Sequence, residues 1–405
     1  MHTTTVSAAR RWSMLAIALG STMCANVFIN GAAFLIPTLH GERGLDLSRA
    51  GLVSAMPSFG MVLTLIAWGW VVDRVGERVV LTVGSLLTAL AAFAAAWAHS
   101  LVAVGAFLLL GGMAAASSNS ASGRLVVGWF PPEQRGLVMG IRQTAQPLGV
   151  GLGALVIPRL AESSGVSAAL LFPAIACLVA GLVTAVGVLD PPRPPRSAAP
   201  ASDLANPYRG SSALARIHAV SVLLVVPQSL VWTFSLVWLM TSHGWSAGAA
   251  GAMVTVAQLC GAAGRIAAGR WSDLAGSRLG PVRVIAVAAG ISMGLLALTD
   301  YLHWPVAVFL LVVASVVTVT DNGLSFTAIA EIAGPFWSGR ALGVQNTSQL
   351  LTTAIVPPAF GALIGVLGFP AAFAACALFP VLAVPLVPIA ADPLRTNPVP
   401  APAPR

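Results

Sequence analysis

The chain carries the stretch GWVVDRVGER at residues 69–78 and a second stretch, GRWSDLAGSR, at residues 269–278. The two stretches share glycine, aspartate, glycine and arginine at the same four positions, and they lie 200 residues apart. Each stretch is the charged exit from a long apolar run, as at the end of a membrane-crossing helix. Repeats on this scale, in a chain that is mostly apolar, predict two related halves built around a central pathway.

The composition agrees with a membrane protein, because 57% of the residues are hydrophobic and only 8% are charged. Soluble domains carry about 25% charged residues. Apolar runs of about 20 residues, the length that crosses a bilayer, occur twelve times. The expected spans are residues 13–36, 49–72, 79–98, 101–128, 136–160, 168–189, 216–241, 247–271, 282–299, 304–333, 339–366 and 369–391.

These spans predict an all-α polytopic protein of two pseudo-symmetric six-helix bundles, residues 1–189 and 216–391. The connection at 190–215 is rich in Pro, Ser, Ala and Arg, so we expect a cytoplasmic linker that cannot be one continuous helix. The tail at 392–405 is dominated by Pro and Ala, and we expect it to be disordered and cytoplasmic.

The arginines predict the orientation of the chain in the membrane. Lysine is missing from the sequence, and fifteen of the 21 arginines lie in the termini, in the even-numbered connections or at the span ends that border them. The odd-numbered connections and the span ends that border them carry only Arg43, Arg49 and Arg159. The positive-inside rule therefore places both termini in the cytoplasm and the protein in the cytoplasmic membrane. The net charge of +8 is therefore explained by this topology. It does not indicate nucleic-acid binding, because the arginines are scattered through short loops and form no basic face.

The sequence lacks the residue patterns that other classes of function require. The four cysteines lie singly in separate spans and the outer histidines lie on different loops, so the spacing predicts no disulfide and no metal site. A phosphate-binding glycine loop, a His-Glu metal motif and a nucleophile elbow are missing from the sequence. We therefore expect a protein that is not an enzyme and that uses no cofactor.

Twelve spans, a central linker and a charged turn after spans 2 and 8 together resemble the major facilitator superfamily. The first turn matches the superfamily's loop signature at Gly69, Asp73, Arg74, Gly76 and Arg78. The second turn matches its weaker copy at Gly269, Asp273, Gly276 and Arg278. The resemblance covers nearly the whole chain and implies a monomeric transporter that contacts membrane lipid.

The signature also has a physical explanation. Gly69 permits close helix packing, and Gly76 permits a turn with positive φ. Asp73 can meet the positive end of a neighbouring helix or an arginine, which forms a latch. The resemblance implies a gating role for the charged residues of both copies: Asp73, Arg74, Arg78, Asp273 and Arg278. The alternative is that these charges only set topology and loop shape.

Asp321 is the most informative polar residue inside a span. It lies 16 residues after Pro305 and 14 before Pro335, near the middle of span 304–333. A carboxylate at that depth is costly, so Asp321 is a candidate proton carrier or a counter-charge for a cationic group. A structural ion pair, or a carboxyl group bonded to Asn322 or Thr318, is the alternative.

Three arginines also lie inside expected spans. Arg142 lies about 10 Å inside span 136–160, where it can bind a carboxylate or phosphate, or pair with Asp321 or Glu331. Arg124 and Arg265 are expected to be shallower, with gating or snorkelling roles.

The remaining pathway candidates come from helical spacing. Asn26 and Asn30 share one face of their span, as do Arg142 and Gln146. Asn322, Gln258 and Trp232 complete the expected pathway; for each, helix packing is the alternative. 

The sequence thus predicts a secondary transporter that moves a small organic solute by alternating access. The intramembrane arginines favour an organic anion taken up with protons. A proton-coupled drug or metabolite efflux antiporter and an uncoupled facilitator are the alternatives. Span 136–160 carries Gly149 and Gly153 but has Ala154 where drug antiporters of the superfamily have proline, which disfavours a multidrug exporter. A sensor that binds ligand without flux is a further alternative.

Overall fold

The computed structural model describes residues 6–35, 47–192, 197 and 199–396. Within these ranges the regular structure is helical, without any strand. The chain divides into two compact units. Unit 1 comprises Met1–Phe130, Thr144–Ala205 and Gly334–Asn346, and unit 2 comprises Pro131–Gln143, Asn206–Ala333 and Thr347–Arg405. Each unit therefore contains most of one sequence half and a short segment of the other.

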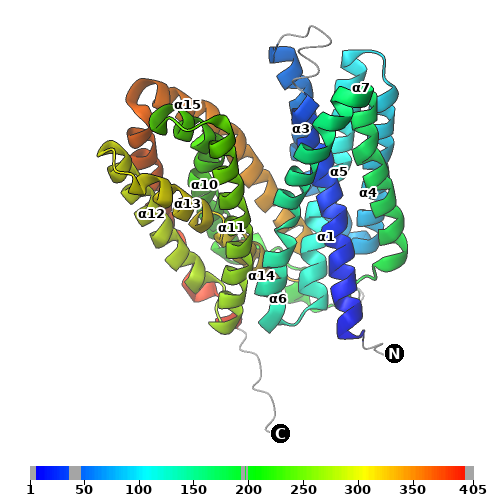
Figure 1. Cartoon of the computed structure of the whole chain (residues 1–405). Helices are drawn as coiled ribbons and strands as arrows, with labels where there is room; N and C mark the ends of the chain where they lie inside the picture. Colours follow the sequence, from blue (N-terminus) through cyan, green and yellow to red (C-terminus); the bar gives the residue numbers. More distant parts are fainter. Residues whose placement is uncertain (1–5, 36–46, 193–196, 198, 397–405) are drawn as a thin grey trace. The chain divides into compact units, whose positions relative to one another are not determined.

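Unit 1 is a bundle of long helices (Figure 1). Its elements are α1 (Ala8–Gly31), η1 (Ala32–Leu35), α3 (Leu47–Val75), α4 (Glu77–Trp97), α5 (Leu101–Trp129), α7 (Ala145–Gly187) and α8 (Ala201–Leu204). α5 packs against both α3 and α4, and α7 packs against both α1 and α4. Phe28 and Leu108 are buried in the apolar core that these helices share. 

Unit 2 has the same general construction. Its elements are α6 (Pro132–Arg142), α9 (Pro207–Gly210), α10 (Ala213–His243), α11 (Ala247–Leu274), α12 (Leu279–Tyr301), α13 (Val306–Val317), α14 (Asp321–Ala333), η3 (Val384–Leu386), η4 (Ile389–Ala391) and α16 (Pro393–Thr396). α15 (Ser338–Ala383) begins in unit 1 and continues in unit 2. In the core of unit 2, Trp238 of α10 meets Phe373 of α15 edge to face at 5.9 Å.

Ten helical segments of the described chain are long and apolar enough to cross a membrane. Two of them, Pro132–Gly187 and Ser338–Leu386, span 56 and 49 residues, which is enough for two crossings each. Each contains one glycine with non-helical dihedrals, Gly165 at φ 82° and Gly368 at φ 79°. The expected pairs of separate spans, 136–160 with 168–189 and 339–366 with 369–391, are thus joined through single glycines.

Two expected continuous helices are interrupted. The span expected at 304–333 ends as α13 at Val317 and restarts as α14 at Asp321. The span expected at 136–160 breaks between α6 and α7 at Gln143 and Thr144. Hydropathy does not detect these breaks, because the intervening residues are not polar enough to end an apolar run. The first break places Asp321 at the start of a helix.

The positive φ predicted for Gly76 is present, at 101°. Gly276, its counterpart in the second repeat, also has a positive φ, 56°. Gly76 separates α3 from α4, and Gly276 lies between α11 and α12. These turns place the charged residues of both repeats at the ends of apolar helices.

The expected disorder of 392–405 is wrong for its first residues. Asp392 is buried, and Pro393–Thr396 form the short helix α16. Asp392 is held in place because it accepts hydrogen bonds from the backbone of the α11–α12 turn. Residues 397–405 lie outside the described residues.

Candidate functional site

Asp73 is the centre of a polar cluster in unit 1. Its carboxylate accepts hydrogen bonds from Gly339 N at 2.8 Å and from Arg340 N at 3.1 Å. Arg340 Nε adds a contact of 3.0 Å. The amides of Gly339 and Arg340 belong to the first turn of α15, where backbone N–H groups have no partner within the helix. Asp73 therefore caps α15 and neutralises the positive end of that helix.

Arg124 of α5 completes this cluster from the other side. Its Nη1 lies 3.1 Å from Asp73 Oδ1, and its Nε lies 3.2 Å from Glu77 Oε1. It also donates to the carbonyl oxygens of Val72 at 2.8 Å and Pro335 at 3.0 Å. The side chain of Arg124 is only 4% exposed, so its charge depends on these partners. We name Asp73, Glu77, Arg124, Gly339 and Arg340 the Asp73 cluster.

Arg74 and Arg78 lie outside the Asp73 cluster. Both are exposed. Arg74 stacks on the ring of Trp70, with 3.7 Å between its guanidinium carbon and the ring centroid. Arg78 Nε donates to the carbonyl oxygen of Ala185 at 2.7 Å. The arginines that contact Asp73 are thus Arg124 and Arg340, and the gating roles of Arg74 and Arg78 stay predictions.

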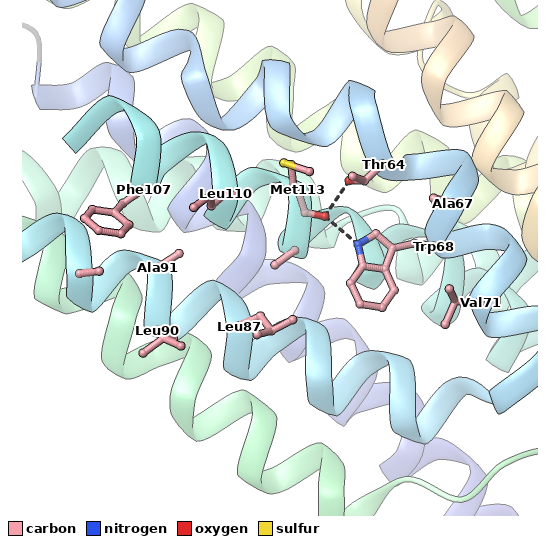
Figure 2. A pocket seen from close by; sticks show the side chains of 12 residues that line it. Thr64, Ala67, Trp68, Val71, Leu87, Leu90, Ala91, Phe107, Leu110 and Met113 are labelled. Atoms are coloured by element: carbon pink, nitrogen blue, oxygen red, sulfur yellow. Dashed lines mark hydrogen bonds between the residues drawn. The ribbon is translucent and has the colours of Figure 1, made fainter. Parts of the chain in front are cut away.

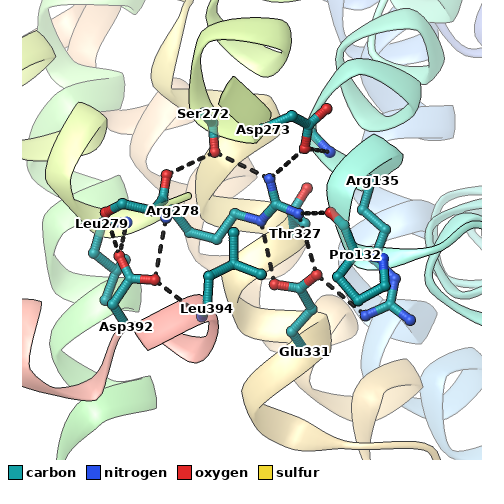
Figure 3. A network of polar contacts seen from close by, with 12 residues as sticks. Pro132, Arg135, Ser272, Asp273, Arg278, Leu279, Thr327, Glu331, Asp392 and Leu394 are labelled. Atoms are coloured by element: carbon teal, nitrogen blue, oxygen red, sulfur yellow. Dashed lines mark hydrogen bonds and ion pairs between the residues drawn. The ribbon is translucent and has the colours of Figure 1, made fainter. Parts of the chain in front are cut away.

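The second copy of the signature builds a different network in unit 2. Asp273 accepts from Gly136 N at 2.9 Å and from Leu137 N at 2.8 Å, both in α6. Arg278 Nη1 lies 2.6 Å from Asp273 Oδ1, and Arg278 Nε lies 3.3 Å from Glu331 Oε2. Arg278 also donates to the carbonyl oxygen of Pro132 (Figure 3). 

Glu331 lies between two arginines, because Arg135 Nη1 contacts its Oε1 at 3.2 Å. The side chain of Arg278 is fully buried. Burial lowers the pKa of Arg278, but Glu331 and Asp273 outweigh that effect, so its pKa is raised above its ordinary value. Arg278 is therefore charged at any physiological pH. We name Asp273, Arg278, Glu331, Arg135 and the α6 amides the Asp273 cluster.

Paired glycines bring the helices of each cluster together. A Cβ on Gly69 would overlap the carbonyl group of Gly339, and a Cβ on Gly269 would overlap the carbonyl group of Gly136. Gly69 and Gly269 stand at the first position of the repeated signature. The close packing predicted for Gly69 is present, and its counterpart in unit 2 is the same.

Asp321 and Arg265 are two buried residues of unit 2 whose side chains interact electrostatically. Asp321 is 1% exposed and Arg265 is 3% exposed. Arg265 attracts Asp321 electrostatically, without a direct ion pair among the described residues. Asp321 Oδ2 and Arg265 Nε have no hydrogen-bond partner in the described part of the chain. The guanidinium of Arg265 lies 5.6 Å from the ring centroid of Trp232. We name Asp321, Arg265 and Trp232 the Asp321 site.

Arg265 is buried inside unit 2, and its depth in the membrane stays a prediction. Arg142 is also buried, but the arginine that attracts Asp321 is Arg265, and the ionic partners of Glu331 are Arg135 and Arg278. Arg142 Nε instead lies 3.1 Å from Met139 Sδ, and its guanidinium lies 5.5 Å from the ring of Phe326. The break after Arg142 and the side chains of α14 explain the difference.

Asn322 lies beside Asp321 in a chain of amides. Asn322 Nδ2 donates to Gln228 Oε1 at 3.0 Å, and Gln349 Nε2 donates to Asn322 Oδ1 at 2.9 Å. Asn322 is thus held by α10 and α15. Trp232 and Gln258 line one narrow cavity of about 10 Å³.

The remaining candidates lie in unit 1. Asn26 Nδ2 donates to Thr22 O at 2.8 Å, and Asn30 Nδ2 donates to Asn26 O at 3.1 Å, so both amides bond to their own helix. Gln146 is exposed, whereas Arg142 is buried, so these two residues do not share a buried face. The turn at Gln143 and Thr144 interrupts the helical spacing on which that prediction rested.

A wide groove of about 480 Å³ lies elsewhere in unit 1, between α3, α4 and α5. Figure 2 shows its lining, in which Thr64 and Trp68 both donate to the carbonyl oxygen of Met113 at 2.7 Å. Leu87, Leu90 and the other groove-lining residues are almost entirely apolar. No predicted pathway residue lines this groove, and its exposed leucines suit contact with lipid.

The sequence matches the Major Facilitator Superfamily over residues 17–357 and again over 217–405. The chain belongs to the major facilitator superfamily. An uncharacterised MFS-type transporter of Mycobacterium tuberculosis is 57% identical over 379 residues, which are 94% of this chain and 85% of the relative. The protein is therefore a multi-pass membrane transporter.

Other relatives match this superfamily member over shorter stretches. A probable anion transporter 4 of Arabidopsis thaliana is 33% identical over 156 residues, 38% of this chain and 29% of the relative. The 4-hydroxybenzoate transporter PcaK of Pseudomonas putida is 29% identical over 158 residues, 37% of this chain and 35% of the relative.

Solved structures agree on the superfamily fold. The proton:xylose symporter XylE matches with a TM-score of 0.76 at 16% identity, covering 94% of this chain and 95% of that chain. The human organic anion transporter MFSD10 matches with a TM-score of 0.75 at 20% identity, covering 93% and 99%. At this identity the likeness concerns the fold alone.

Sequence reasoning missed several residues of the clusters in this MFS protein. Glu77 and Arg340 are members of the Asp73 cluster that the sequence did not indicate. Asp190 and Asp392, which accept hydrogen bonds from the repeated turns, were also missed. A signal for the last two was present, because Asp190-Pro191 recurs as Asp392-Pro393 at nearly the same repeat distance. No comparable repeat marks Glu77, whose counterpart is Ser277.

Proposed function

We propose that this transporter takes up a small organic anion together with protons, and that the Asp321 site couples the two. The observation that supports this most is the burial of Asp321 and Arg265, each with one polar atom that has no hydrogen-bond partner among the described residues. A buried polar atom without a partner is costly, so such atoms mark a place where a ligand or proton binds.

The charges of the Asp321 site give a simple rule of coupling. When Asp321 is ionised, it offsets the positive charge of Arg265, and the site has little attraction for an anion. When Asp321 carries a proton, Arg265 keeps a net positive charge that suits a carboxylate. Binding of the anion and binding of the proton therefore favour each other, which is the requirement for symport.

The substrate class rests on charge and on the relatives. Arg265 is buried and its Nε has no hydrogen-bond partner in the described part of the chain, which favours an anionic ligand. Trp232 lies beside Arg265 and offers an aromatic wall. The names of two relatives, a probable anion transporter and a 4-hydroxybenzoate transporter, support a carboxylate substrate. 

The pathway is proposed to involve further polar residues. Asn322 is oriented by its amide chain and stands next to Asp321. Asn26, Asn30, Gln146 and Gln258 remain proposed pathway residues that would meet the solute in a second state. Transport then requires one bundle to rock against the other, with residues 190–215 as the linker.

The two signature clusters are proposed to act as latches. In the Asp73 cluster, a carboxylate of α3 holds the start of α15, which comes from the other half of the sequence. In the Asp273 cluster, a carboxylate of α11 holds α6, again from the other half. Breaking and reforming these contacts would separate the halves at one face of the membrane. We place this face and both termini in the cytoplasm, and the protein in the cytoplasmic membrane as a monomer.

Uptake by proteoliposomes tests the proposal. The purified protein is reconstituted into liposomes with a pH-sensitive dye inside, and benzoate, 4-hydroxybenzoate, glucarate, choline and ethidium are added in turn under an imposed pH gradient. The proposal expects a carboxylate to enter together with protons. Exchange of a cation or drug for protons would instead make the protein an efflux antiporter, and carboxylate flux without proton movement would make it a facilitator. Protein-free liposomes are the control.

A further inference from the structure

Asp190 makes a contact with the first signature turn. Its Oδ1 accepts a hydrogen bond from Arg78 N at 2.8 Å. The same carboxylate lies against Gly76, where a Cβ would meet Asp190 Oδ1 at 2.6 Å. Arg78 stands in the first turn of α4, whose backbone N–H groups lack partners within the helix. Asp190 comes just after the end of α7, the last long helix of the first sequence half.

Asp392 makes the equivalent contact in unit 2. Its Oδ1 accepts from Arg278 N at 3.2 Å, and its Oδ2 accepts from Leu279 N at 2.8 Å and from Ser277 Oγ at 2.6 Å. Asp392 comes just after η4, at the end of the second sequence half. It is fully buried, whereas Asp190 is exposed.

The two contacts are repeats of one another. Arg78 and Arg278 occupy the same position of the signature, and each offers its backbone N–H to the aspartate that ends its own half. Each aspartate is followed by proline, Pro191 or Pro393. The first contact lies within unit 1 and the second within unit 2, so the same arrangement is observed once in each unit.

We propose that Asp190 and Asp392 are positioning residues. Each one fixes the backbone of its signature turn relative to the latch carboxylate of the same unit, Asp73 or Asp273. The inference rests on the proposed latch function of Asp73 and Asp273. In unit 2, Asp392 fixes the backbone of Arg278, whose side chain holds Asp273, which in turn holds the α6 amides. A movement at the end of the last helix is thereby passed to the latch.

Unit 1 offers the same route through a different side chain. Asp190 fixes the backbone of Arg78, which is adjacent to Glu77. Glu77 contacts Arg124, which contacts Asp73, and Asp73 caps α15 at Gly339. The route therefore links the start of the linker, at Asp190, with the start of α15. If Asp190 served only to stabilise α4, its removal would affect the first turn of α4 and leave the Asp73 cluster unchanged.

Hydrogen exchange measured on the purified protein in nanodiscs tests this inference without any substrate. Asp190→Ala and Asp392→Ala are compared with the wild type for peptides that cover 334–345 and 131–142, which carry the amides held by Asp73 and Asp273. Ser100→Ala is the matched control, because Ser100 Oγ caps α5 through Ala103 N at 3.1 Å and is not part of either cluster. Asp190→Asn and Asp392→Asn keep an acceptor oxygen.

We expect the alanine variants to exchange about tenfold faster in the distant peptides, with the larger effect at Asp392. Asp190→Asn should lie near the wild type, because only Oδ1 of Asp190 accepts among the described residues, whereas Asp392→Asn should be intermediate, because both oxygens of Asp392 accept. Faster exchange confined to the capped turns at 76–80 and 276–280 would overturn the inference. An equal increase in Ser100→Ala would also overturn it. If an alanine variant fails to fold, the serine variant at the same position replaces it and is judged by the same criterion. The exchange experiment uses no substrate, so its result does not depend on whether the protein transports an organic anion. Failure of this inference and failure of the transport proposal can therefore be told apart.

Discussion

Asp73 and Arg340 stand 267 positions apart in the sequence, and Arg340 Nε lies 3.0 Å from Asp73 Oδ2. The same carboxylate accepts the backbone N–H groups of Gly339 and Arg340. One side chain of the first signature therefore binds both a helix terminus and an arginine. In the second signature, Asp273 likewise binds a helix segment, but the arginine that contacts Asp273 is Arg278 of the same signature.

Asp73→Asn is expected to weaken the Asp73 cluster. The amide keeps one acceptor oxygen but loses the charge that attracts Arg340 and Arg124. Spin labels at Val75 and Leu274, in a variant without the four native cysteines, should show a distance distribution shifted toward the state in which this face is open. An unchanged distribution would remove Asp73 from the proposed gate. Arg74→Gln, which changes an exposed arginine outside the cluster, should leave the distribution unaltered.

Gly69→Ala is expected to push α15 away from α3. Its new methyl group would overlap the carbonyl group of Gly339, and overpacking of this kind costs about 1–3 kcal/mol. Gly151→Ala is the matched control, because a Cβ there meets no atom within 4 Å, and replacing glycine in a helix with alanine gains up to about 1 kcal/mol. Thermal unfolding in detergent should therefore occur earlier for Gly69→Ala and not for Gly151→Ala. Equal unfolding temperatures would show that the close packing at Gly69 is unimportant.

Arg278→Ala is expected to destabilise unit 2 strongly. It leaves Asp273 and Glu331 buried without their shared cation, and breaking a buried ion pair costs about 3–5 kcal/mol. Arg135→Ala should cost less, because the side chain of Arg135 is 21% exposed and solvent screens its charge. Thermal unfolding of both variants measures the difference, and a larger loss for Arg135→Ala would contradict the account of the Asp273 cluster.

The contribution of Arg278 is also expected to be independent of pH over the usual range. Glu331 and Asp273 outweigh the effect of burial and raise the pKa of Arg278 above its ordinary value. A base with a raised pKa stabilises the fold fully below its unfolded pKa and loses that effect only as the pH rises through the folded value. The unfolding difference between wild type and Arg278→Gln should thus be equal at about pH 6 and about pH 9. A difference that fades within this window would contradict the charge state assigned to Arg278.

Arg265→Lys is expected to weaken binding of an anionic solute. Lysine keeps the charge but lacks the planar pair of donors that a carboxylate prefers. We expect KM for carboxylate uptake to rise about tenfold or more, since a hydrogen bond to a charged group contributes about 1.5–3 kcal/mol. Arg159→Lys, at an exposed arginine that donates to Leu155 O, is the control. An unchanged KM in Arg265→Lys would exclude Arg265 from the binding site.

The sequence predicted the fold through features that depend on local chemistry. The repeat and the apolar runs predicted helices and their superfamily, and Gly76 predicted a turn of positive φ. These predictions succeed because a bilayer restricts spanning segments to a few forms, and because glycine adopts positive φ more readily than other residues. 

The details of the clusters were not predictable in the same way. Arg78 and Arg278 stand at equal positions of a repeat, yet one is exposed and the other is fully buried. The difference arises from residues far away in sequence: Arg124 neutralises Asp73 in unit 1, whereas Glu331 draws Arg278 inward in unit 2. The pairing of Asp321 with Arg265 depended likewise on the break before α14, which hydropathy does not show.

The central claim is that Asp321 carries the proton that accompanies an anionic solute, and proton movement per solute in Asp321→Asn tests it most directly. Wild type, Asp321→Asn and the control Asp300→Asn, which changes another buried carboxyl group of unit 2, are reconstituted at equal density and given the same carboxylate under an imposed pH gradient. The account predicts that Asp321→Asn folds and exchanges solute across the membrane but no longer accumulates it or moves protons, whereas Asp300→Asn does both. Proton-driven accumulation by Asp321→Asn at the wild-type level would contradict the claim.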